Sequence, residues 1–150
     1  MSRMKKILTL TVIAVATLTL SCQPDLRDDP IPWVPFDVIH LNLNLPEYND
    51  LRTDGRYIYL NNDGVRGIIV YHPSGNQYIA YERNCSFQPN SACATVEVHP
   101  STLYILCPCC NSTFDLATGY PTGGAAWRPL RQYATSYDGG VLTITDLIVE

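Results

Sequence analysis

The chain has 150 residues and a formal net charge of −4, with 46% hydrophobic and only 16% charged residues. Both of its lysines lie within the first six positions, so the remainder is acidic and has arginine as its only fixed cation. This charge balance argues against a nucleic-acid-binding protein and against electrostatic adhesion to anionic lipid.

The N-terminus predicts a secretory leader at residues 1–21. A short basic segment precedes an uncharged apolar stretch at 7–20, and polar residues follow directly. The stretch is shorter than the roughly 20 apolar residues that a membrane-spanning helix needs. The boundary residues Ser-Cys resemble a bacterial lipobox, in which the cysteine is diacylated and becomes the mature N-terminus. We therefore predict a lipoprotein that is lipidated at Cys22 and contacts the membrane through the lipid.

Residues 22–36 predict a tether between this lipid and the folded part of the chain. The sequence QPDLRDDPIPWVPF after the cysteine contains four prolines and three aspartates. Proline stiffens such a segment toward extended geometry, which would hold the domain off the bilayer. Its acidic start resembles the export signal of surface lipoproteins in Bacteroidota. We expect a lipid-anchored protein of the cell envelope, at the outer membrane.

Residues 37–150 are predicted to form one domain. From residue 37 onward, the pattern of apolar and polar residues has a period of two. In DVIHLNLNL, apolar residues alternate with polar ones, which is typical of a half-buried strand. No stretch of useful length shows helical spacing. Short strands separated by turn signals indicate an all-β antiparallel sandwich or barrel. We expect further strands at 57–61, 65–71, 77–83, 95–99, 103–107, 130–137 and 141–149.

Five cysteines besides Cys22 lie close together in the sequence. An exported protein can form disulfides, but pairing five cysteines leaves one thiol over. Their clustering in two loops, each after a predicted strand, is typical of a metal site. These residues are Cys85, Cys93, Cys107, Cys109 and Cys110.

Three stretches resemble the Rieske iron–sulfur family: ERNCSF (82–87), CPCCNSTFDLATG (107–119) and GGAAWRPL (123–130). That family has a Cys-x-His loop followed by another cysteine, a Cys-Pro-Cys-His-Gly-Ser-x-Phe-Asp loop, and a loop that covers the cluster. The resemblance implies an antiparallel β-fold with a metal-loop subdomain inserted at roughly residues 84–129. It also implies one-electron transfer through a 2Fe–2S cluster to a redox partner protein.

Residue by residue, the resemblance places Cys85 and Cys107 at the two cysteine-ligand positions of the family. It also implies a disulfide between Cys93 and Cys109, which would join the two loops. Apart from these positions, Trp127 lies in the loop that the resemblance places over the site, and is a candidate for an exposed contact.

The two histidine positions of the family carry other residues in this chain. A Rieske centre has two cysteines on one iron and two histidines on the other. Phe87 occupies the first histidine position and Cys110 the second. Because a phenylalanine ring has no lone pair to donate, a standard Rieske centre cannot be built at these positions.

Three outcomes therefore remain open. Cys85, Cys93, Cys107 and Cys110 supply four thiolates for an all-cysteine 2Fe–2S cluster, with a potential below that of a true Rieske centre. The same four sulfurs can close around zinc. Without a metal, the family's disulfide forms and Cys85 pairs with Cys107 or Cys110. With zinc or with disulfides in place of iron, the chain would be a redox-inactive structural or binding module of Rieske fold.

No residues arranged for catalysis are evident in the sequence. It contains no Ser-His-Asp arrangement, no phosphate-binding glycine loop and no credible acid–base pair. We predict that the protein is not an enzyme and is at most a redox carrier.

Overall fold

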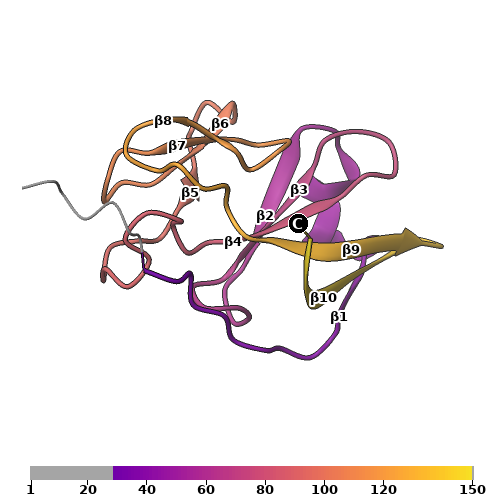
Figure 1. Ribbon diagram of the computed structural model, residues 1–150. Coiled ribbons are helices and arrows are strands. Elements are labelled where there is room, and N and C mark those ends of the chain that lie inside the picture. Colours follow the sequence, from indigo (N-terminus) through magenta and orange to yellow (C-terminus); the bar gives the residue numbers. More distant parts are fainter. Residues whose placement is uncertain (1–28, 150) are drawn as a thin grey trace, which may run out of the picture.

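The structure, a computed structural model, describes residues 29–149 as two antiparallel sheets and one short helix (Figure 1). The predicted all-β class with an inserted cysteine-loop subdomain is confirmed. The predicted leader, Cys22 and the first part of the predicted tether lie outside the described residues. Within residues 29–149, no helix has both the length and the apolar character needed to span a bilayer.

The larger sheet has six strands in the order β1-β10-β9-β4-β3-β2, and each neighbouring pair is antiparallel. Alternate side chains of these strands face a shared hydrophobic core. Val70, Tyr133 and Leu142 are completely buried in this core. The strands are β1 (Ile39–Asn42), β2 (Arg56–Leu60), β3 (Ile68–His72), β4 (Ile79–Glu82), β9 (Gln132–Asp138) and β10 (Val141–Val149).

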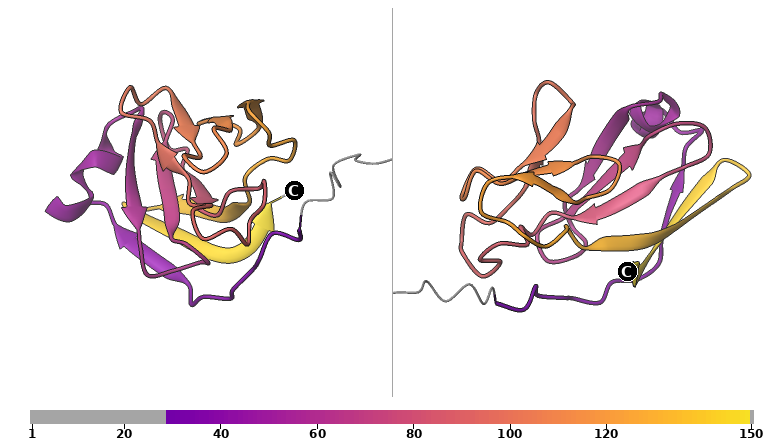
Figure 2. Two further views of the ribbon diagram at one scale, coloured as in Figure 1. Left: turned by 90° about the vertical axis from the view of Figure 1, so that its left-hand side faces the viewer. Right: turned by 45° about the horizontal axis from the view of Figure 1, so that its top comes forward.

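The smaller sheet is formed by the chain between β4 and β9, in the order β5-β6-β7-β8, and it lies beside the larger sheet (Figure 2). Its buried residues Ile105 and Phe114 share one hydrophobic cluster with Tyr81 of the larger sheet. Cys85 and Cys107 belong to the same cluster. The junction of the two sheets therefore positions the cysteines. The strands are β5 (Glu97–Val98), β6 (Tyr104–Leu106), β7 (Thr113–Asp115) and β8 (Pro121–Gly123).

The helix and two of the strands are not predicted by hydrophobic periodicity. The 3₁₀ helix η1 (Pro46–Arg52) begins with a proline, whose fixed φ suits a first helical turn, and it buries Leu51 completely. Strands β7 and β8 are three residues long, and Phe114 is the only buried residue of the two. Such elements are too short to show a period.

A buried carboxylate lies at the point where the chain leaves the larger sheet for the smaller one. Glu82, the last residue of β4, is completely buried. It accepts hydrogen bonds from the backbone N–H groups of Val65, Arg66 and Asn84 at 2.7, 3.0 and 3.1 Å. The Tyr133 hydroxyl donates a fourth at 2.8 Å. These bonds hold β4, β9 and the turn before β3 together.

Residues 29–36, which we call the N-terminal strap, run along the outside of the domain (Figures 1 and 2). The guanidinium of Arg131 donates to two carbonyl oxygens of the strap. The Phe36 ring packs edge-on against Tyr133, with 4.9 Å between ring centroids. At the other end, Asn90 donates to the Asp29 carboxylate at 2.9 Å. The described part of the predicted tether is thus bonded to the domain.

Candidate metal centre

The first cysteine loop begins directly after β4 and is fixed by backbone pairing and by one arginine. The Cys85 N–H donates to the Ala94 carbonyl at 2.9 Å, which closes the loop at its base. Arg66 donates to the Asn84 side chain at 2.7 Å and to the Ser91 carbonyl at 2.7 Å. The sequence carries no signal for this role of Arg66, because the arginine lies in a turn before β3.

The second cysteine loop is a tight turn between β6 and β7. The Asn111 N–H donates to the Cys107 carbonyl, and the Cys107 N–H donates to the Ser112 carbonyl, both at 2.8 Å. Asn111 has a φ of 56°, a left-handed conformation that asparagine tolerates better than most residues. The turn brings residues 107 and 110 to the same side of the loop.

The two loops together place three free thiols side by side. The Sγ atoms of Cys85, Cys107 and Cys110, which we call the thiol cluster, all lie within 4.8 Å of one another. The Sγ atoms of Cys85 and Cys110 are 3.7 Å apart. Cys85 and Cys107 are completely buried, and Cys110 is half-buried. Among residues 29–149, no other group of three or more cysteine, histidine or acidic side chains is close enough to share an ion.

Two of these thiols influence each other's protonation. The Cys85 thiol donates to the Cys107 sulfur, and this hydrogen bond holds the pKa of Cys107 below its ordinary value. The same hydrogen bond, together with burial, raises the pKa of Cys85. The pair therefore favours one thiolate, on Cys107, and one thiol, on Cys85.

A loop after β8 covers the thiol cluster and is linked to it through Ser112. The Ser112 hydroxyl oxygen accepts from the Ala125 and Ala126 N–H groups at 3.0 and 2.8 Å, and from the Cys110 thiol at 3.1 Å. Gly124 has a φ of +84°, and a Cβ at this position would lie 2.6 Å from the Asn111 carbonyl oxygen. Only glycine allows so close an approach.

Trp127 lies in this covering loop and is 61% exposed. The Arg128 guanidinium lies 5.3 Å from the centre of its ring and also donates to the Ser86 carbonyl at 2.9 Å. The indole therefore sits at the edge of the cysteine loops, open to solvent.

Cys93 does not join the thiol cluster, because its sulfur is bonded to that of Cys109. The disulfide joins the two loops, as the sequence resemblance implies. It also removes the fourth thiolate that an all-cysteine cluster or a four-sulfur zinc site would use.

Phe87 and the histidines contribute no ligand to the cluster. Phe87 is half-buried and packs against the hydrophobic cluster that contains Cys85 and Cys107. All three imidazoles are hydrogen-bonded elsewhere: His40 to Thr143, His72 to the Gly75 carbonyl and His99 to Ser101. Within residues 29–149, the donors available to a metal at this position are thus three sulfurs.

Three sulfurs so close together suit a single ion better than a two-iron cluster. In a tetrahedral zinc site with Zn–S bonds of about 2.3 Å, neighbouring sulfurs lie about 3.8 Å apart. The separation of 3.7 Å between Cys85 and Cys110 is close to this value. A 2Fe–2S cluster needs four ligands, two on each iron. The described donor set does not fit that cluster.

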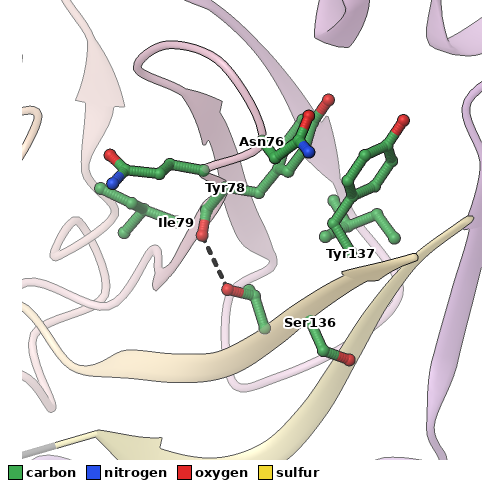
Figure 3. Close-up of a pocket in the computed structure, with 8 residues that line it drawn as sticks. Asn76, Tyr78, Ile79, Ser136 and Tyr137 are labelled. Atoms are coloured by element: carbon green, nitrogen blue, oxygen red, sulfur yellow. Dashed lines mark hydrogen bonds between the residues drawn. The ribbon is translucent and has the colours of Figure 1, made fainter. Parts of the chain in front are cut away.

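The structure also has a polar surface pocket of about 300 Å³ between the start of β4 and the β9–β10 hairpin (Figure 3). Tyr78 and Tyr137 lie next to each other in it, and Thr135 donates to the Tyr78 carbonyl at 2.7 Å. The described lining contains amides, hydroxyls and apolar groups, but no carboxylate, imidazole or thiol. This lining offers no acid–base pair and no residue of the cysteine loops.

Comparisons with known proteins give structural similarities only. No family model matches the chain, and no curated protein matches it. One similar solved structure is the complex of reduced oxygenase and oxidized ferredoxin in carbazole 1,9a-dioxygenase. It is 17% identical, with a TM-score of 0.49, over 81% of this chain and 99% of that chain.

Two ferredoxins are also similar in structure. The ferredoxin of carbazole 1,9a-dioxygenase from Nocardioides aromaticivorans IC177 is 23% identical, with a TM-score of 0.43, over 62% of this chain and 86% of that one. The Sphingomonas yanoikuyae B1 ferredoxin is 19% identical, with a TM-score of 0.45, over 62% of this chain and 87% of that one. At these levels of similarity, it is the chain's own sheet topology that establishes the fold class.

Proposed function

We propose that the protein is a metal-binding module in which Cys85, Cys107 and Cys110 hold one thiophilic ion, with Zn²⁺ as the principal candidate. The observation that carries this proposal is the mutual proximity of three free sulfurs within 4.8 Å. Thiolates are preferred ligands of Zn²⁺, and three protein ligands leave its fourth position open to solvent or to a ligand from a partner. Cu⁺, which also favours thiolates, is the main competitor.

Metal analysis of the full-length chain tests this proposal. We expect about one Zn²⁺ per chain, and cobalt substitution should produce the sulfur-to-metal charge-transfer band of a thiolate site. Cys107→Ser removes a buried ligand and should lower the affinity at least about 100-fold. The matched control is the Cys93→Ser/Cys109→Ser double variant, which leaves all three thiols and should still bind the ion. The proposal would be contradicted if the protein, with Cys85, Cys107 and Cys110 as free thiols, bound neither Zn²⁺ nor Cu⁺.

A second candidate is an iron–sulfur protein of the Rieske type with altered ligands and a role in electron transfer. The sequence resemblance and the loop-to-loop disulfide favour it. It requires a fourth ligand that residues 29–149 do not supply at the cluster. The same metal analysis separates the candidates, because a 2Fe–2S cluster brings two irons with inorganic sulfide. An iron–sulfur protein of this kind would also exchange electrons with a redox partner protein, which remains a prediction.

We also propose that a lipid on Cys22 holds the protein at the outer membrane of the cell envelope. Asp29 at the start of the strap is bonded to Asn90 and, through its carbonyl oxygen, to Arg128. Seven residues extend to about 25 Å at most, so the lipid would keep the cysteine loops near the bilayer. Labelling cells with radioactive palmitate should mark the parent chain and not Cys22→Ala. Equal labelling of both would contradict lipidation at this residue.

A further inference from the structure

Cys110 differs from the other two thiols of the cluster in its access to solvent. The sulfurs of Cys85 and Cys107 are completely buried, whereas Cys110 is half-buried. Of the three residues in the thiol cluster, Cys110 is therefore the one that keeps some solvent-exposed surface. Among the described cysteines, Cys93 and Cys109 are already joined to each other and offer no free thiol.

Cys85 is positioned to react with a modified Cys110. Their sulfurs are 3.7 Å apart, close to van der Waals contact. The two residues come from different loops, and the disulfide between Cys93 and Cys109 already holds these loops together. A second bond between the loops therefore needs only a small movement of the two side chains.

We propose that Cys110 is an oxidation site for hydroperoxides and that Cys85 is its resolving thiol. The Cys110 thiol gives up its proton and its sulfur attacks one peroxide oxygen, which forms an S–O bond and breaks the O–O bond. The leaving oxygen takes up the proton and departs as an alcohol or water, and Cys110 is left as a sulfenic acid. The Cys85 sulfur then attacks the Cys110 sulfur and expels the hydroxyl as water. Two thiols lose two electrons in total, and the peroxide accepts them.

The disulfide removes two of the three ligands of the proposed metal site. Cys107 alone cannot hold the ion, so oxidation should release it and lower the affinity by more than the roughly 100-fold expected for Cys107→Ser, which loses only one ligand. This consequence rests on the proposed metal binding. The formation of the disulfide does not, and it can be followed on metal-free protein.

The experiment treats the full-length chain, metal-free and Zn²⁺-loaded, with one equivalent of hydrogen peroxide. Peptide mapping without reduction should find Cys85 linked to Cys110, the Cys93–Cys109 bond unchanged and Cys107 free. A chromophoric chelator should detect Zn²⁺ release from the loaded sample. Cys107→Ser should still form the link, whereas Cys110→Ser should leave Cys85 and Cys107 reduced.

Several outcomes would overturn the proposal. They are a bond between Cys107 and Cys110, a bond between Cys85 and Cys107, or a Cys110 that proceeds to sulfinic acid without any link. Because the parent chain itself is mapped, the result does not depend on the folding of a variant. If the metal-free chain forms the predicted link but never binds Zn²⁺, the proposed metal site fails and the oxidation site stands.

Discussion

Replacing Glu82 with alanine is expected to lower the free energy of unfolding by about 3–5 kcal/mol, because four donors lose their acceptor inside the protein. Three of these donors are backbone N–H groups and the fourth is the Tyr133 hydroxyl. The residue is completely buried, so water cannot easily take the place of the carboxylate. Urea unfolding of the full-length chain, followed by tryptophan fluorescence, measures the loss.

Tyr133→Phe is the matched control for this variant. It keeps the buried ring and removes one of the four hydrogen bonds to Glu82, so we expect it to cost about 1.5–3 kcal/mol. The remaining difference reports the three backbone bonds, two to the turn before β3 and one at the start of the first cysteine loop. If Glu82→Ala costs no more than Tyr133→Phe, the carboxylate does not hold this junction.

The second large effect is expected on removing the disulfide between the cysteine loops. The cysteines are 16 residues apart in sequence, and a loop of this length corresponds to about 3 kcal/mol of stabilisation through the unfolded state. Cys93→Ser combined with Cys109→Ser should lower the free energy of unfolding by about this amount. Urea unfolding of the parent with and without a reducing agent provides the comparison.

Under reducing conditions the parent and the double variant should unfold at nearly the same urea concentration. Under oxidising conditions the parent alone should be more stable. A double variant as stable as the oxidised parent would mean that other contacts already fix the loops. The hydrogen bonds of Arg66 to the first loop are the main candidates for such contacts.

The regular part of the fold could be predicted from the sequence. Alternation indicates a strand wherever one face is buried, as at the start of β10. A short apolar run indicates a strand that is buried on both faces, as in β3. Strands β7 and β8 could not be predicted in this way, because their three residues are held by neighbours rather than by their own pattern. The same limit applies to η1, whose length is too small for a helical period.

The sequence by itself determined which residues carry chemistry: five clustered cysteines, and a phenylalanine where the Rieske family has a ligand. It left open whether Cys93 pairs with Cys109, as the resemblance implies, or serves as a fourth metal ligand beside Cys85, Cys107 and Cys110. Only the tertiary structure separated Cys93 from the other three, through the distance between two loops. It also placed the strap against the domain, because the hydrogen-bond partners of Asp29 are far from it in sequence. Spacing along a chain fixes local geometry, whereas contacts between distant segments depend on how the sheets pack.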